Sequence, residues 1–146
     1  DFGDTAGLTP LMKMHTLGAS VIPEPIHAGG LRYHGMAPLV SHLYELGLVE
    51  AISIPQTECF EGALQFARAE GIVPAPEPTH AIAAAAREAM ACKESGEEKV
   101  ILTALCGHGH LDLAAYETFL SGQMVDLDLP DSAIQVAMQN VPEIEG

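Results

Sequence analysis

One stretch restricts the fold of this chain more than any other: the almost wholly apolar run Val100–Leu105, which leads directly into Cys106–His110. A short apolar run of this kind is typical of a strand that is covered on both faces, as in a parallel sheet. A helical pattern capped by Thr79 and stopped at Gly96 precedes it, and another follows over Asp112–Leu120. Because helix and strand alternate, the sequence predicts an α/β fold with a partial parallel sheet and flanking helices.

The remaining elements are predicted from apolar spacing and from glycine and proline boundaries. In chain order they are a short buried strand at Leu11–Leu17, a helix at Pro38–Leu46, a strand at Val49–Pro55, a helix capped by Thr57 and closed by Gly71, and a short helix at Asp131–Asn140. The helix capped by Thr79 is expected to bury a stripe formed by Ile82, Ala85, Ala86, Ala89 and Met90. A parallel sheet of only two or three strands rarely stands alone. We therefore expect this chain to be a partial domain.

Composition and charge exclude several classes of function. The 146 residues are 48% apolar, enough for one core, but no apolar stretch approaches the roughly 20 residues needed to cross a bilayer. Six Lys and Arg against 20 Asp and Glu give a net charge of −14, which repels nucleic acid and anionic lipid. Three cysteines without short paired spacing favour a reducing, cytoplasmic location. The start without Met predicts a piece of a longer protein.

Three segments are candidates for chemistry, because ligands of α/β sheets bind beyond the carboxyl ends of the strands. They are the glycine-rich loop Gly29–Gly35, Glu77 among its prolines, and the segment Cys106–His110. The glycines of the last segment are expected to let the backbone approach a ligand or to turn with a positive φ. Glu77 is either a favourable charge near a helix N-terminus or a carboxylate held rigidly for catalysis.

Two further interpretations stay open at the level of the residues. Cys106, His108 and His110 alternate along an extended segment and could chelate a metal ion such as zinc. Arg32 could pair with a surface carboxylate or clamp an anionic substrate group. A non-catalytic α/β module that binds a small molecule or a partner is also compatible with these loops.

Four runs of the sequence together resemble one family. They are D-T-A-G-L-T-P-L-M-K-M-H-T-L-G (4–18), I-H-A-G-G-L-R-Y-H-G-M-A-P (26–38), F-A-R-A-E-G-I-V-P-A-P-E-P-T-H-A-I (66–82) and E-K-V-I-L-T-A-L-C-G-H-G-H-L-D (98–112). They resemble the C-terminal third of the tryptophan synthase β chain, in its second, longer subgroup. The resemblance implies a fold-type-II pyridoxal-phosphate enzyme that joins L-serine and indole to give L-tryptophan and water by β-elimination and replacement.

The resemblance also implies a division of the chain within the large cofactor-binding domain. Residues 1–37 would be an ordered Gly/Pro-rich loop segment, 38–122 the βα units, and 123–146 a C-terminal tail with a short helix. The lysine that holds the cofactor and the G-G-G-S-N loop that holds its phosphate match nothing here, since Lys13, Lys93 and Lys99 occur in other contexts. We therefore expect this piece alone to be inactive.

Residue roles carry over by position. Glu77 matches the family glutamate that lies near the pyridine ring and assists serine dehydration. Cys106 stands where most members have a serine that contacts the pyridine nitrogen, and Gly107 follows it at the cofactor. Because a thiol is a weak hydrogen-bond partner, that nitrogen is expected to stay unprotonated.

Other matched positions concern the substrate and a cation. Arg32 and His108 fall at substrate-site positions, where shorter β chains have an aspartate and an arginine. Tyr33 and Gly35 match positions whose backbone carbonyls bind a monovalent cation. The family also implies a homodimer of the full-length chain and a possible tryptophan synthase α subunit as partner.

Overall fold

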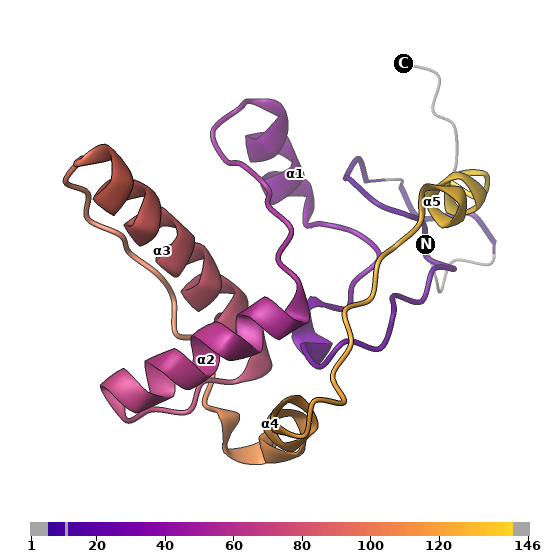
Figure 1. Ribbon diagram of the computed structural model, residues 1–146. Coiled ribbons are helices and arrows are strands. Elements are labelled where there is room, and N and C mark those ends of the chain that lie inside the picture. Colours follow the sequence, from indigo (N-terminus) through magenta and orange to yellow (C-terminus); the bar gives the residue numbers. More distant parts are fainter. Residues whose placement is uncertain (1–5, 11, 142–146) are drawn as a thin grey trace. The chain divides into compact units, whose positions relative to one another are not determined.

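A computed structural model describes residues 6–10 and 12–141 of the chain. Within these residues the regular elements are all helical (Figure 1). They are η1 (Gly29–Leu31), α1 (Pro38–Glu45), α2 (Gln56–Glu70), α3 (Pro76–Ser95), η2 (Gly109–Leu111), α4 (Leu113–Leu120) and α5 (Asp131–Met138), of which η1 and η2 are single 3₁₀ turns. Among the described helices, none combines the length and the apolar character needed to cross a membrane.

The predicted strand Val100–Leu105 does not form in this structure. The run has no regular secondary structure and pairs with no other described segment, and all its residues are exposed. Val100 is 100% exposed and Leu102 95% exposed. A strand of a parallel sheet needs neighbours that receive and supply its backbone hydrogen bonds, and an apolar pattern by itself provides none. The partial parallel sheet is therefore not confirmed.

The other predicted strands are also missing from the described part of the chain. Val49–Pro55 has no strand structure. Of Leu11–Leu17, the first residue lies outside the described residues, and the rest contributes only an isolated antiparallel bridge between Thr16 and Gly35. The predicted strands are thus not confirmed for the described residues of these segments either.

Helix ends follow the prediction more closely. The chain leaves α2 at Gly71 with φ 70° and α3 at Gly96 with φ 74°, both in the left-handed region that glycine adopts without strain. The predicted helices at Pro38–Leu46 and Asp131–Asn140 are confirmed as α1 and α5.

Helix starts differ from the prediction, because proline rather than threonine begins both long helices. Pro55 precedes α2, and Pro76 is the first residue of α3. Neither Thr57 nor Thr79 is a cap: Thr57 lies inside α2 and donates its hydroxyl to Asp126, whereas Thr79 is buried inside α3 and donates to the Pro76 carbonyl at 2.6 Å. Proline at the first helical position fixes φ in advance and needs no N–H partner.

The buried part of α3 is also shifted relative to the prediction. Its buried residues are Pro76, Pro78, Thr79 and Ala83, all in its first half. Of the predicted stripe, Ala86, Ala89 and Met90 are exposed, and only Ile82 and Ala85 are half-buried. The buried face predicted from apolar spacing is therefore wrong in the second half of α3. The described residues leave most of that half exposed.

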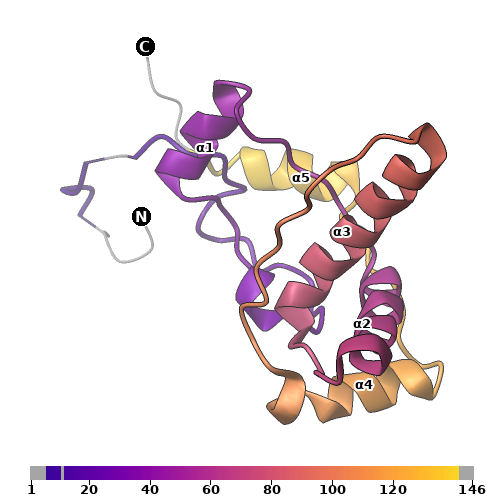
Figure 2. The same ribbon diagram turned by 90° about the vertical axis from the view of Figure 1, so that its left-hand side faces the viewer.

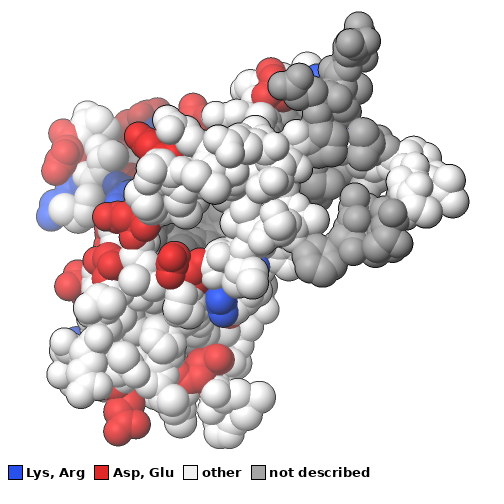
Figure 3. All heavy atoms as spheres, turned by 90° about the vertical axis from the view of Figure 1, so that its right-hand side faces the viewer, with Lys and Arg blue, Asp and Glu red and all other residues white. Residues whose placement is uncertain are grey.

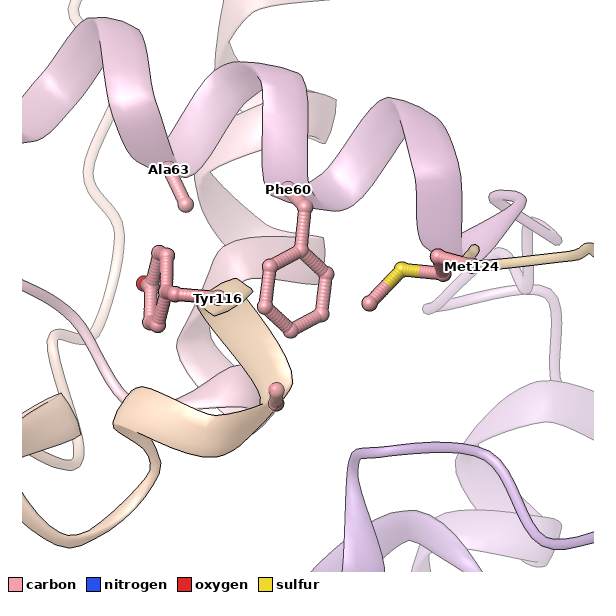
Figure 4. Packing of buried hydrophobic residues seen from close by; sticks show 5 residues of the cluster. Phe60, Ala63, Tyr116 and Met124 are labelled. Atoms are coloured by element: carbon pink, nitrogen blue, oxygen red, sulfur yellow. The ribbon is translucent and has the colours of Figure 1, made fainter. Parts of the chain in front are cut away.

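One compact unit consists of residues 25–31 and 53–127. Helices α2 and α3 lie side by side in it, and α4 packs across α2 (Figures 1 and 2). Figure 4 shows Phe60 of α2 reaching between Tyr116 of α4 and Met124. The Phe60 and Tyr116 rings meet edge to face, with centroids 5.0 Å apart, a favoured aromatic geometry. This cluster is the main core of the unit.

The other compact unit consists of residues 1–24, 32–52 and 128–146, as far as these are described. The Thr16–Gly35 bridge brings its first two segments together, and the Leu17 N–H donates to the His34 carbonyl at 2.7 Å. His15 extends this link to α1, since its Nε2 lies 2.9 Å from Oε1 of Glu45.

The charged side chains on the surface are mainly acidic. On the face drawn in Figure 3, Asp and Glu clearly outnumber Lys and Arg, in keeping with the net charge of −14.

Candidate functional site

The loop after the apolar run pairs with the segment that leads into α3. The Ala75 N–H donates to the Gly107 carbonyl at 3.0 Å, and the Gly109 N–H donates to the Val73 carbonyl at 2.8 Å. Pro74 and His108 thereby form an isolated antiparallel bridge. We call this pairing of residues 73–75 with 107–109 the crossing. It lies within one compact unit and fixes two of the three segments predicted to converge.

Glycine is required on one side of the crossing. A Cβ at Gly107 would lie 2.8 Å from the Ala75 Cβ. A Cβ at Gly109 would come still closer to the Pro74 carbonyl oxygen, and this obstacle is backbone that cannot rotate away. These glycines thus allow two segments of the chain to approach closely, and neither glycine adopts the expected positive φ. The approach of a ligand to this backbone stays a prediction.

Glu77 lies directly beyond the crossing, in the first turn of α3. Its neighbours Pro76 and Pro78 are fully buried, so the backbone that carries the carboxylate is firmly packed. The side chain is half-buried, and its Oε1 accepts a hydrogen bond from the Gly30 N–H at 2.8 Å. Among the described residues, Oε2 has no hydrogen-bond partner. Glu77 is thus both a charge at a helix N-terminus and a rigidly held carboxylate.

The third segment reaches the site through η1. The Leu31 N–H donates to the carbonyl of buried Ala28 at 2.9 Å and closes this turn beside Glu77. The preceding residue, His27, donates its N–H to Oε1 of buried Gln56 at 3.3 Å. Gln56 in turn donates to the Val125 carbonyl, so the first residue of α2 links the turn to the segment after α4.

The cysteine and histidines of the loop do not form a metal site. Cys106 is an exposed free thiol, and the Nδ1 of His108 accepts the His110 N–H at 3.1 Å. The two imidazole rings lie 6.3 Å apart and are tilted, because Gly109–Leu111 form a 3₁₀ turn rather than an extended segment. The described residues contain no group of three side chains suited to a metal ion. The zinc interpretation lacks structural support.

The predicted substrate and cation residues Arg32, Tyr33 and Gly35 belong to the other compact unit. Arg32 Nη2 donates to the Pro23 carbonyl at 2.9 Å, while its buried Nε has no hydrogen-bond partner in the described part of the chain. Tyr33 is largely exposed. Gly35 is packed so closely on Thr16 that a Cβ there would lie 2.9 Å from the threonine Oγ1. Close packing against Thr16 therefore explains why this residue is a glycine. Its role in binding a cation stays a prediction.

Two residues that matter at the site were not singled out from the sequence. Buried Tyr116 donates its hydroxyl to the Pro74 carbonyl at 2.6 Å and so anchors the crossing on the core. Burial, with a smaller contribution from Asp112, raises the pKa of Tyr116 to about 12. Gln56 joins three segments, as described above. A tyrosine in an apolar helical pattern and a glutamine after a proline carry no signal that distinguishes them from ordinary packing residues.

Ionisable groups elsewhere in this unit serve its packing. Burial raises the pKa of the Cys59 thiol to about 11, which keeps it neutral and unreactive. Arg87 donates to both carboxylate oxygens of Glu58, with 2.6 Å between Nε and Oε1, and ties α3 to α2. This hydrogen-bonded arginine holds the pKa of Glu58 below its usual value.

Comparisons with known proteins agree with the resemblance noted in the sequence. No protein-family model matches the chain. The chain is 64% identical over 126 residues to "Tryptophan synthase beta chain 2" of Aquifex aeolicus, which covers 86% of this chain and 29% of that relative. The proteins of the same name from Methanosarcina acetivorans and Thermotoga maritima are 58% and 63% identical over 86% and 80% of this chain. Each alignment covers 28% of that relative, so the chain spans less than a third of the length of these proteins.

Proposed function

This chain belongs to the tryptophan synthase beta chain family, and we propose that it supplies one wall of an active site that joins L-serine and indole to give L-tryptophan and water. The observation that carries the proposal is the convergence of three segments. The Glu77 carboxylate rests on the Gly30 N–H, and the crossing holds Cys106 and Gly107 next to the segment that leads to Glu77.

The residues at this convergence fit pyridoxal phosphate, the cofactor that the family resemblance implies. A carboxylate with one unengaged oxygen and an exposed thiol are suitable neighbours for a pyridine ring, and Gly30 and Gly107 add no side chain of their own at the convergence. Glu77 would lie beside the ring, and Cys106 and Gly107 would contact it at the nitrogen edge. When bound, the cofactor is an electron sink that allows the bond to the serine hydroxyl to break.

Glu77 is the residue to which we assign the proton chemistry. Because Gly30 occupies Oε1, Oε2 is the atom available to hold the proton that accompanies the serine hydroxyl as it leaves as water. The weak thiol of Cys106 would leave the pyridine nitrogen unprotonated. Arg32 and His108 are proposed to bind the substrate, and the Tyr33 and Gly35 carbonyls to bind a monovalent cation.

The rest of the site is proposed to come from polypeptide outside this sequence. Lys99 is paired with Glu97, 3.2 Å between Nζ and Oε2, and Lys93 lies in the last turn of α3, so neither is free at the convergence. The cofactor lysine and the phosphate loop would therefore be contributed by the remaining part of the beta chain. Neighbouring strands from that part would also convert Val100–Leu105 into a strand of the parallel sheet of a fold-type-II enzyme.

The assembled enzyme is proposed to be a homodimer that can associate with a tryptophan synthase alpha subunit. We propose a cytoplasmic location, because the free cysteines of the described chain suit a reducing compartment. The position of this chain within the family sequence, in its C-terminal part, stays a prediction.

A chimera tests the proposed function. The 126 aligned residues of the Aquifex aeolicus relative are replaced by those of this chain, and tryptophan formation from L-serine and indole is measured. We expect the chimera to be active and Glu77→Gln to lower kcat by about 100-fold or more, the usual contribution of a proton-transferring group. Glu88→Gln, an exposed carboxylate on the same helix, is the matched control and should leave kcat unchanged.

Two results would contradict the proposal. One is a chimera that folds and binds the cofactor but forms no tryptophan. The other is a Glu77→Gln chimera whose kcat equals that of the Glu88→Gln control.

A further inference from the structure

We propose that Gly30 is a positioning residue for Glu77, and that its backbone N–H holds the carboxylate in one orientation. The inference rests on the proposed function, in which Glu77 performs the proton chemistry. It adds a residue 47 positions away in the sequence that acts on the reaction only through Glu77.

The contact itself is a backbone hydrogen bond to a charged acceptor. Gly30 N and Glu77 Oε1 are 2.8 Å apart, within the range of a charge-assisted hydrogen bond. A backbone donor has a fixed direction, unlike a lysine or serine side chain that can rotate. Because the bond engages Oε1, it also determines which oxygen of Glu77 remains available toward a substrate.

Both ends of this contact are anchored. The turn is closed by the Leu31–Ala28 hydrogen bond and tied through His27 to Gln56 at the start of α2. Glu77 is fixed by the buried prolines on either side of it. Since α2 and α3 pack side by side in the same compact unit, the donor and the acceptor are carried by one rigid framework.

The space around Gly30 explains why this residue is a glycine. A Cβ there would lie 3.2 Å from both Cγ and Oε1 of Glu77, so the glutamate side chain would have to move by a few tenths of an ångström. The adjacent Gly29 has no atom within 4 Å of an added Cβ. Neither glycine has a positive φ, so alanine is compatible with the backbone at both positions. The chain therefore offers a perturbing and a neutral substitution side by side.

A first experiment observes the contact directly in the 146-residue chain labelled with ¹⁵N-glycine. Glu77→Gln replaces the charged acceptor by a neutral one, so it should move the Gly30 amide resonance and leave that of Gly29 nearly unchanged. Glu88→Gln should move neither resonance. A Gly30 amide that does not respond to Glu77→Gln would overturn the inference, whatever the activity of the enzyme.

A second experiment measures the consequence in the chimera. Small displacements of a positioned catalytic group are costly, so Gly30→Ala should lower kcat by about tenfold with little change in KM for serine. Gly29→Ala should leave both constants unchanged. Added to Glu77→Gln, Gly30→Ala should have almost no further effect, because the group that it displaces no longer acts.

The outcomes separate this inference from the proposed function. If Glu77→Gln lowers kcat but Gly30→Ala behaves like Gly29→Ala, the positioning role is wrong and the proposed function stands. If Gly30→Ala lowers kcat by the same factor with Gln at position 77, its effect is general damage and the inference is overturned. If Glu77→Gln leaves kcat unchanged, both the proposed function and the positioning role fail.

Discussion

Two neighbouring stretches of the chain differ sharply in their backbone hydrogen bonding. The crossing at Gly107–Gly109 is bonded to residues 73–75, and Gly109 is buried. The run Val100–Leu105, immediately before it, has the strongest strand pattern in the sequence and yet pairs with nothing that the structure describes. Residues a few positions apart thus differ between a bridge with two backbone hydrogen bonds and no described pairing.

The difference shows that a segment becomes ordered only where its hydrogen-bond partners are supplied. The crossing needs one neighbouring segment and glycines that permit a close approach, and this chain contains both. A central parallel strand needs a neighbour on each edge and helices on each face. Stable monomers rarely expose contiguous apolar surface, and this exposure is what the proposed neighbouring strands would remove.

The largest effect is expected when a charged side chain is introduced into the exposed run Val100–Leu105. Leu102→Asp should leave the stability of the isolated chain within about 0.5 kcal/mol, because the side chain is 95% exposed there. In the chimera the same substitution should prevent folding or abolish tryptophan formation, because an unpaired charge would be buried in the sheet. Urea unfolding of the chain and activity of the chimera measure the two effects.

Leu102→Val is the control for this prediction. It keeps the position apolar and suits a strand, so both proteins should accept it. Equal tolerance of Leu102→Asp in the chimera would show that the run stays exposed in the larger protein, and the proposed sheet would be wrong.

A smaller effect is expected at the crossing, where this chain already supplies the partner. Gly109→Ala forces a Cβ against the Pro74 carbonyl and should destabilise the isolated chain by about 3 kcal/mol, at the upper end for overpacking. Gly29→Ala, whose added Cβ meets open space, should change stability little. Urea unfolding measures both variants, and equal midpoints would mean that the crossing does not form in the isolated chain.

Much of the helical structure is predictable from local signals. Glycine ends a helix through its own left-handed conformation, so Gly71 and Gly96 mark the ends of α2 and α3 without reference to anything distant. Helix starts are harder to assign, because Thr79 and Pro76 are both acceptable near an N-terminus. Burial of the threonine hydroxyl against the Pro76 carbonyl becomes visible only in three dimensions. The strand predictions from local pattern were not confirmed, because an apolar pattern does not supply the neighbouring strand that a sheet requires.

In the candidate site, too, some features can be recognised in the sequence and others only in the structure. The glycine pattern after the apolar run marks Gly107 and Gly109 as special positions, and the structure shows that they allow close contact with the segment before α3. The bond from Gly30 to Glu77 joins residues 47 positions apart and uses a backbone N–H, which every residue other than proline possesses. No residue type identifies such a donor. The role of Tyr116 is likewise set by tertiary packing alone.

The smallest predicted effect concerns the anchor of the crossing. Tyr116→Phe removes the hydroxyl that donates to the Pro74 carbonyl while it keeps the ring packed against Phe60. The loss of one buried hydrogen bond should destabilise the isolated chain by about 1 kcal/mol. Tyr33→Phe, at a largely exposed ring, is the matched control and should have no measurable effect on the urea midpoint.

The pH dependence of this variant sharpens the test. Because the folded protein raises the pKa of Tyr116 from 10.0 to about 12, the stability linked to its neutral form is complete below pH 10 and is lost as pH rises toward 12. The phenylalanine variant lacks this titration, so the stability difference between the two proteins should shrink as pH rises above 10. Other titrating groups, Cys59 among them, are common to both proteins and cancel in the difference. A difference that stays constant up to pH 12 would show that the Tyr116 hydroxyl is not held in the core, and that the crossing has a different anchor.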